Sequence, residues 1–210
     1  MATAVKGQVR KERAAATRRK VLQAATAEFA EHGYVATTMA AIAERAGVAV
    51  QTVYFAFRTK PELLTAAIDA AVLGDDPVPP GRTAWHREAT THPDPRTAMS
   101  AFITGTLSIE QRAAGLKQAV QAAAQTDADV AVVRDRHEQL RAAGFGGFAR
   151  SLAERGMLAD GVTPEHATDV LLAMAGAGLF LELTRERGWD VDSYGSWLTD
   201  ALCRLLLVPS

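Results

Sequence analysis

The fold is decided by residues 38–60, TMAAIAERAGVAVQTVYFAFRTK. Small and apolar residues recur in this stretch at the spacing of two short helices that cross at a tight turn. They are Ile42, Ala43, Ala46, Val48 and Val53. Gly47 lies at the turn, where a positive φ is often needed and a side chain would cost energy. The pattern predicts a helix-turn-helix unit, the arrangement that places one helix in the major groove of DNA.

Composition sets the broad class of the protein. Of the 210 residues, 48% are apolar and 6% are aromatic, and Ala and Leu are abundant. This favours an all-α fold, because Ala and Leu are strong helix formers. Cys203 is the single cysteine, which excludes an internal disulfide framework and suits a reducing cytoplasm.

The start of the chain is polar and basic, without the apolar core of a signal peptide. No uninterrupted apolar stretch approaches the length of a membrane span, about 20 residues. We therefore expect a cytoplasmic protein with no membrane partner.

Charge is divided unevenly along the chain. Residues 1–60 hold ten Lys or Arg against four Glu, whereas residues 61–210 hold thirteen basic residues against twenty acidic ones. The basic end suits a polyanion and the acidic remainder does not. Residues 1–13 are expected to form a mobile basic arm, and the alternative is that this arm is merely solvated.

Cap signals divide the chain into helices. Thr38 is a natural N-cap, Ala49 is a poor one, and Thr59 to Glu62 has the spacing of a capping box. Later starts are expected at Asp94-Pro95, Thr126-Asp127, Thr163-Pro164 and near Asp190. The expected helices, about nine in all, span roughly 14–32, 38–46, 49–55, 59–72, 95–113, 115–124, 127–155, 164–186 and 191–207. Residues 74–95 hold five of the eight prolines and are expected to form an extended connection.

From about Arg18 to Leu64 the sequence resembles the TetR family of bacterial transcriptional regulators. The matching residues are Ala24-Ala25, Phe29, Gly33-Tyr34, Thr37-Thr38, Ile42-Ala43, Ala46-Gly47-Val48, Thr52-Val53-Tyr54, Phe57 and Lys60-Pro61-Glu62-Leu63-Leu64. Trp189 to Leu207 also resembles the last helix of many actinobacterial members. The resemblance implies an all-α homodimer with an N-terminal three-helix DNA-binding domain, residues 1–60, and a helical effector-binding and dimerisation domain, residues 61–210. It also implies a repressor that a small effector releases from a palindromic double-stranded DNA operator.

The reading helix of this unit carries no charged side chain. Gln51 is its only amide and is able to bond adenine N6 and N7 as a pair. Val50 either lies against a thymine methyl group or is a solvent-exposed filler. Phe55 either faces the groove or folds back, and the residues leave this choice open.

Affinity is therefore expected to come mostly from phosphates. Thr38 lies at a helix N-terminus, which attracts phosphate. Tyr54 and Lys60 occupy positions that usually bond the DNA backbone in the family, although core packing is the alternative for Tyr54. Thr52 is expected to touch a base or a phosphate. Four arginines are expected to reach flanking phosphates or the minor groove, namely Arg10, Arg13, Arg18 and Arg19, whereas Arg45 and Arg58 are expected to be solvated or paired.

A candidate effector pocket lies among the helices of the larger domain. Its expected lining is Phe102, Thr106, Leu116, Val120, Leu140, Phe145 and Phe148, with Gln118 and Gln121 as polar contacts. Ordinary core packing is the alternative for the apolar members, and the set favours a largely apolar effector. The expected dimer surface consists of Leu172, Ala175, Leu179, Phe180, Trp197, Leu198, Ala201 and Leu205, for which internal packing is again the alternative.

No catalytic motif or metal site accompanies these features. His137-Glu138 lacks the second histidine of a zinc-protease helix, and Gly144-Phe-Gly-Gly lies inside a predicted helix and follows no strand. No cysteine cluster offers a metal site, no cofactor is expected, and Cys203 suits buried packing better than redox sensing. The alternative function is a helical small-molecule-binding protein, or an enzyme subunit, with a vestigial DNA module. The set Thr38, Thr52, Tyr54 and Lys60 favours a working regulator that is not an enzyme.

Overall fold

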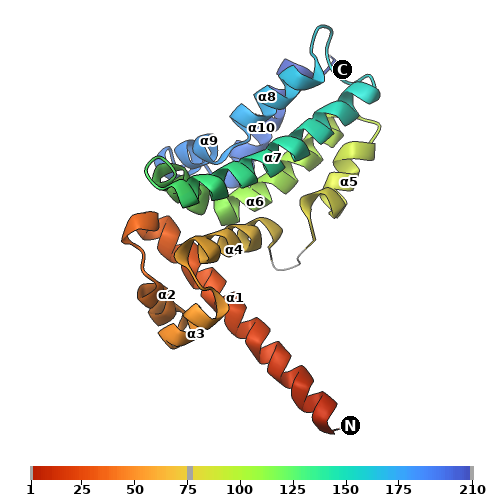
Figure 1. Cartoon of the computed structure of the whole chain (residues 1–210). Helices are drawn as coiled ribbons and strands as arrows, with labels where there is room; N and C mark the ends of the chain where they lie inside the picture. The colour runs from red at the N-terminus through yellow and green to blue at the C-terminus, as the bar shows by residue number, and fades with distance from the viewer. Residues whose placement is uncertain (1, 75–77, 209–210) are drawn as a thin grey trace. The chain divides into compact units, whose positions relative to one another are not determined.

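The computed structural model describes residues 2–74 and 78–208, and these residues form an all-helical fold (Figure 1). Its helices are α1 (Ala2–Ala36), α2 (Met39–Ala46), α3 (Val50–Ala56), α4 (Lys60–Leu73), α5 (Ala84–Thr91), α6 (Pro95–Ala123), α7 (Ala128–Glu154), α8 (Pro164–Met174), α9 (Ala177–Leu181) and α10 (Val191–Leu206). A 3-10 turn, η1 (Pro80–Arg82), precedes α5, and a π-helical turn, η2 (Glu182–Glu186), follows α9. The predicted all-α class is confirmed.

The chain divides into two compact units. Unit 1 contains the residues up to Ala71 together with Gly115–Val133, and unit 2 contains Val72–Ala114 together with the residues from Arg134 onward. Helices α6 and α7 therefore each contribute one part to unit 1 and another part to unit 2. The predicted boundary between a DNA-binding and an effector domain after residue 60 concerns function and stays a prediction.

The predicted helix starts are confirmed where a side chain caps them. The Thr38 hydroxyl accepts a hydrogen bond from the Ala41 amide at 3.1 Å, whereas Ala49 makes no side-chain cap. At the start of α4, the Thr59 hydroxyl accepts from the Glu62 amide at 3.2 Å, and the Glu62 carboxylate accepts from the backbone amide of Arg58. Such caps satisfy amides that lack a partner within the helix.

Two segments predicted to be irregular are helical. Residues 2–13 belong to α1, which Figure 1 shows projecting beyond α2 and α3, so the predicted basic arm is helical in this structure and its mobility stays a prediction. Most of these residues are good helix formers, and the Gln8 amide donates to the Glu12 carboxylate one turn later at 3.0 Å. The prolines of the expected connection lie outside residues 81–92, which allows α5 to begin at the Thr83 cap.

Two predicted helix boundaries are also wrong. The expected helices 95–113 and 115–124 are one helix, α6, and Gly115 lies where a Cβ atom would come within 3.1 Å of Ala30. The expected helix 164–186 is instead interrupted at Ala175 and Gly176. Side chains of other helices donate hydrogen bonds to the backbone carbonyls next to this break. Arg141 donates to Leu172 O at 3.2 Å, and Tyr194 donates to Met174 O at 3.2 Å.

The interrupted segment also has the length and composition of a membrane span. Pro164–Glu186 covers 23 residues, and it is the helical stretch among the described residues that meets this test. Charged residues and the break at Ala175 and Gly176 interrupt this segment, so it does not contradict the expectation that no uninterrupted apolar stretch approaches such a length. The break between α8 and α9 is not expected of a lipid-exposed span, because free backbone groups are costly in hydrocarbon.

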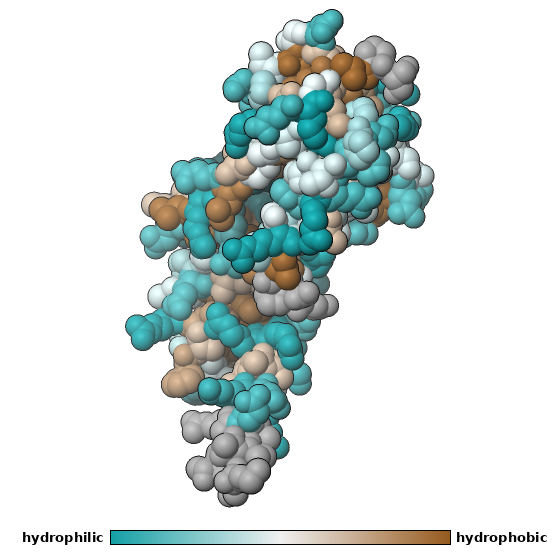
Figure 2. All heavy atoms as spheres, turned by 90° about the vertical axis from the view of Figure 1, so that its right-hand side faces the viewer, coloured by the Kyte–Doolittle hydropathy of each residue, from teal (hydrophilic) through white to brown (hydrophobic). Residues whose placement is uncertain are grey.

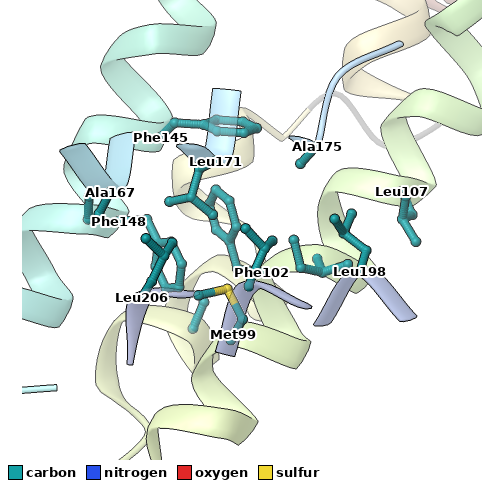
Figure 3. Close-up of a cluster of buried hydrophobic side chains, with 14 of the residues drawn as sticks. Met99, Phe102, Leu107, Phe145, Phe148, Ala167, Leu171, Ala175, Leu198 and Leu206 are labelled. Atoms are coloured by element: carbon teal, nitrogen blue, oxygen red, sulfur yellow. The ribbon is translucent and has the colours of Figure 1, made fainter. Parts of the chain in front are cut away.

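The core of unit 2 is built around stacked aromatic rings (Figure 3). The rings of Phe102 and Phe148 lie parallel with centroids 4.0 Å apart, and Phe145 meets Phe102 edge-on at 5.0 Å. Figure 3 shows Leu171, Leu206 and other apolar side chains around them. Aromatic pairs at these separations add to the stabilisation that burial alone provides.

Candidate nucleic-acid interface

The corner between α1 and α2 is fixed by hydrogen bonds and one ion-pair cluster. The buried Thr37 hydroxyl lies 2.8 Å from Gly33 O and 3.1 Å from Glu28 O. On the neighbouring face, the Arg45 guanidinium contacts Glu31 through two nitrogens, at 2.7 and 2.8 Å, and Glu28 at 2.9 Å. These hydrogen bonds from Arg45 lower the pKa of the Glu31 carboxyl. Arg45 is thus paired within unit 1, as one of the two predicted alternatives stated, and it holds α2 against α1.

The turn between α2 and α3 depends on Gly47. This residue has φ 66° and ψ 38°, and its amide is directed at the carbonyls of Ala43 and Glu44 at the end of α2. The next amide, from Val48, donates to Ala43 O at 3.0 Å. This left-handed C-cap is the arrangement that glycine adopts most easily, so the predicted role of Gly47 is confirmed.

Helix α3 turns its amide and its two aromatic side chains to solvent. Val53 is fully buried, and Tyr54 and Phe55 are 52% and 93% exposed. Gln51 is exposed, whereas Val50 and Thr52 are half-buried. The core-packing alternative for Tyr54 and the folded-back alternative for Phe55 are therefore excluded, and both rings are accessible to a partner.

Thr38 is exposed beside this helix pair. Because its oxygen accepts from the Ala41 amide, its hydroxyl proton stays able to donate to an anion. The amides at the start of α2 add the partial positive charge of a helix N-terminus. Thr38 thus keeps a donor available beside the start of α2, and its contact with a phosphate stays a prediction.

Two of the predicted phosphate-binding cations are held within unit 1. The Lys60 ammonium lies 4.2 Å from the centroid of the Tyr34 ring and donates to Val35 O at 3.4 Å. Burial lowers the pKa of Lys60, and burial together with Asp127 raises the pKa of Tyr34 to about 12. Arg18 likewise lies 4.2 Å above the Phe57 ring and donates to Ala56 O at 3.4 Å. To bond DNA phosphates with the same nitrogens, each side chain must either give up its contacts with the ring and the carbonyl or bond the phosphate in addition to them.

The other basic side chains of α1 are open to solvent. Arg13 and Arg19 are exposed, together with Lys11 and Lys20. The side chain of Arg10 lies outside those that the structure describes. A helical α1 presents these cations along a rod rather than a flexible arm, which fixes their spacing for a polyanion.

The structure does not gather the predicted effector residues around one cavity. Phe102, Phe145 and Phe148 lie in the aromatic core of unit 2, Thr106 is buried, and Leu140 is 59% exposed. Leu116, Val120, Gln118 and Gln121 belong to unit 1, where the first two are buried and the two amides are exposed. The packing alternative thus describes the aromatic members better, and their place in an effector site stays a prediction.

A pocket that the sequence did not reveal lies elsewhere in unit 2. It has a volume of about 270 Å³ and is formed by the end of α4, η1, the start of α5 and the middle of α6. Its lining is Val72, Leu73, Val78, Pro80, Arg82, Thr83, Ala84, Trp85, Ser108, Ile109 and Arg112. The sequence analysis missed this pocket because it did not predict α5, the short helix between two groups of prolines. This helix places Trp85 in the lining of the pocket, with its ring directly on α6 at Gly105, where a Cβ atom would come within 2.0 Å of Trp85 Cδ2.

The predicted dimer residues separate into two groups. Ala175, Phe180 and Leu198 are buried within unit 2 itself, as the packing alternative states. Trp197 and Leu205 are 38% and 54% exposed, and Leu172, Leu179 and Ala201 are half-buried. Trp189 and Val208, which were not predicted, are 38% and 37% exposed, and the Trp189 ring meets Trp197 edge-on at 5.7 Å. A partner surface would therefore centre on the exposed face of α10.

Gln51→Ala is expected to relax base preference at one position of each DNA half-site. The lost pair of hydrogen bonds to adenine corresponds to about 1–3 kcal/mol of discrimination. Lys60→Ala provides the contrast, because loss of a phosphate contact weakens every sequence alike and lowers the salt slope by about 1. Binding to a set of operator variants at several salt concentrations separates the two effects. Equal weakening of every operator variant by Gln51→Ala would contradict its assignment as a base reader.

Comparison with known proteins agrees with this geometry. Residues 21–67 match the family model of bacterial regulatory proteins, tetR family. The chain is 28% identical over 206 residues to the HTH-type transcriptional repressor BepR of Brucella suis, an alignment that covers 95% of this chain and 96% of that protein. The matched family segment includes all the predicted DNA contacts of α2, α3 and α4.

Solved structures show the same fold. NalD, the secondary repressor of the MexAB-OprM multidrug efflux pump in Pseudomonas aeruginosa, is 24% identical with a TM-score of 0.67, over 95% of this chain and 100% of that one. SmeT in complex with triclosan is 23% identical with a TM-score of 0.72, over 93% of each chain. SmeT is the repressor of the Stenotrophomonas maltophilia multidrug efflux pump SmeDEF.

Proposed function

Because the chain belongs to the TetR family of bacterial regulatory proteins, we propose that it represses transcription as a homodimer on a palindromic operator until a small molecule releases it. Its relatives are transcriptional regulators, so the expectation that it is not an enzyme is confirmed. The protein acts in the cytoplasm, where its operator lies.

The exposed face of α3 carries the DNA-binding part of this proposal. Gln51, Tyr54 and Phe55 are accessible together on one short helix, and the buried Val53 and the Gly47 turn fix that helix against α2. Thr38 and the cations of α1 supply charge and donors for the phosphate backbone. A vestigial DNA module would have no need for exposed base-reading side chains together with phosphate donors. This disfavours the alternative of a small-molecule-binding protein with an inactive DNA module.

Two further observations support a homodimer that responds to a ligand. The exposed Trp197 and Leu205 on α10 are the kind of large apolar side chains that are enriched in stable interfaces. The pocket of unit 2 approaches the lower limit of small-molecule sites, about 300 Å³. NalD and SmeT are described as repressors of multidrug efflux pumps, and we extend to this chain the proposal of a small, largely apolar effector.

The full chain is expected to form a dimer in sedimentation and to protect an inverted repeat upstream of its own gene or of a divergent neighbour. Leu205→Glu on the exposed face of α10 should shift the chain toward monomer, because it places a charge in an apolar interface. It should weaken operator binding more than Leu140→Glu, which changes an exposed leucine of α7. A wild-type monomer at micromolar concentration, or a dimer that protects no inverted repeat, would contradict the proposed function.

A further inference from the structure

We propose that Phe55 reads the 5-methyl group of one pyrimidine in each DNA half-site, so that the protein prefers thymine there and distinguishes 5-methylcytosine from cytosine. This inference rests on the proposed function, since it names what one side chain of the DNA-binding unit recognises. It adds sensitivity to methylation of the operator, a property that the amide of Gln51 does not supply.

Phe55 lies on the outermost face of α3. Each residue of an α-helix advances by about 100° around the axis, so Gln51 and Phe55 lie about 160° and 200° from Val53. Val53 is fully buried, whereas Gln51 is exposed and Phe55 is 93% exposed. Gln51 and Phe55 are four residues apart and therefore neighbours on one face. They are the two side chains of α3 that are directed most nearly away from the core of unit 1.

The place of Phe55, rather than its exposure alone, points to a contact with DNA. Figure 2 shows brown apolar side chains among teal polar ones on the face in view, and single exposed apolar residues are common on protein surfaces. The second helix of a helix-turn-helix unit, however, enters the major groove with its outer face toward the bases. A ring at the outermost position of α3 is therefore buried against base edges when the protein binds its operator.

The chemistry of the ring decides what it recognises there. A benzyl group neither donates nor accepts a conventional hydrogen bond, so it cannot pair with the donors and acceptors of the base edges. The 5-methyl group of thymine is the apolar group that the bases present in the major groove, and phenylalanine is one of the side chains that contact it. Cytosine methylated at C5 presents a methyl group at the same ring atom. The ring thus distinguishes pyrimidines by this methyl group.

Val50 is the other large apolar side chain of α3 apart from the buried Val53. It is half-buried and lies only about 60° from Val53 around the helix, so it presents less apolar surface to a base than Phe55 does. Val50 also precedes Phe55 by about 7.5 Å along the axis, which exceeds the spacing of successive base pairs, about 3.4 Å. A methyl group that contacts Val50 therefore belongs to a different base pair, and variants of the two residues are separable.

Uracil substitution tests the reading of a methyl group. The probe is an inverted-repeat duplex that the wild-type full chain selects from a random library, and each symmetric pair of thymines is replaced in turn by deoxyuridine. This change removes only the 5-methyl group. We expect one pair of replacements to weaken wild-type binding about tenfold or more, from about fourfold at each half-site. Phe55→Ala should bind the thymine and uracil forms of that duplex equally in fluorescence anisotropy.

Cytosine substitution at the same pair of positions tests sensitivity to methylation. With guanine opposite, the wild-type chain should bind the 5-methylcytosine duplex more tightly than the cytosine duplex, again by about tenfold, and Phe55→Ala should not distinguish them. A methyl group also changes the shape and stiffness of DNA, but that effect would persist in Phe55→Ala. The ratio of the two affinities should also be the same at low and high salt, because an apolar contact releases no counterions.

Two further variants control for the change at Phe55. Phe55→Leu retains an apolar side chain and should keep part of the methyl preference. Val132→Ala removes an apolar side chain of α7 that is 70% exposed, and it should change neither affinity nor preference. All these substitutions lie at exposed positions, where stability usually changes by no more than about 0.5 kcal/mol.

Failure of the inference is separate from failure of the proposed function. If the wild-type chain binds its selected duplex but shows no thymine preference over uracil, or if every such preference persists in Phe55→Ala, the reading of a methyl group by Phe55 is overturned and the regulator is not. Equal wild-type binding of the 5-methylcytosine and cytosine duplexes likewise overturns the sensitivity to methylation. If the wild-type chain selects no inverted repeat, the proposed function itself is contradicted, and the inference falls with it.

Discussion

Phe148→Ala is expected to lower the free energy of unfolding by about 3–5 kcal/mol, the cost of truncating a fully buried aromatic ring. The Phe148 side chain is completely buried and stacks on Phe102 at 4.0 Å. Its removal deletes apolar contacts and leaves a cavity, because the surrounding helices are too closely packed to collapse fully. Urea unfolding followed by circular dichroism measures this loss.

Leu140→Ala on the same helix is the control for that variant. Leu140 is 59% exposed, so its truncation should change stability by no more than about 0.5 kcal/mol. The two substitutions share the helix and differ in burial. Equal stability of the two variants would mean that the stacked rings are not the packed centre of unit 2, and that the rings remain available to form an effector site.

Gly47→Ala is expected to cost about 1–2 kcal/mol of stability, the strain of a left-handed conformation in a residue with a Cβ atom. A Cβ atom at this position would meet no described atom within 4 Å, so the cost comes from the backbone alone. The turn can relieve the strain only by changing the angle between α2 and α3. We therefore expect operator affinity to fall about tenfold or more, which corresponds to about 1.4 kcal/mol.

Gly161→Ala controls for backbone strain without a change in the DNA-binding unit. Gly161 has φ 80° in the loop before α8, and a Cβ atom there would also have no neighbour within 4 Å. Its substitution should cost a similar amount of stability and leave operator affinity unchanged. If both variants bind the operator as the wild type does, the geometry of the Gly47 turn does not control DNA binding.

Local chemistry explains which parts of the fold were predictable. Thr38 and Thr59 cap helices because the side-chain oxygen of an N-cap residue reaches the backbone amide three residues later at the start of any helix. Gly47 was predictable for the same reason, since the turn demands a conformation that few residues adopt. These requirements concern neighbours in sequence, so no knowledge of the rest of the fold was needed.

The predictions failed where residues that are distant in the sequence determine the local structure. The break after α8 contains no proline, and it is stabilised by Arg141 and Tyr194 from two other helices. Helix α5 was hidden because prolines flank it on both sides. The apolar periodicity of Phe102 and Phe148 was read correctly, but it does not distinguish a packed core from the wall of a cavity. The pocket depends on which helix Trp85 faces, and only the assembled fold determines that.

The contact of Trp85 with α6 at Gly105 also restricts how this sequence can change over evolutionary time. Any side chain at position 105 would collide with the indole, since even a methyl group would lie within 2.0 Å of it. Position 105 must therefore stay glycine while position 85 carries a large ring, and loss of that ring frees position 105 to vary. Among descendants of this chain, the two positions should change as a pair, and a lineage with alanine at 105 should also have replaced Trp85 with a smaller residue.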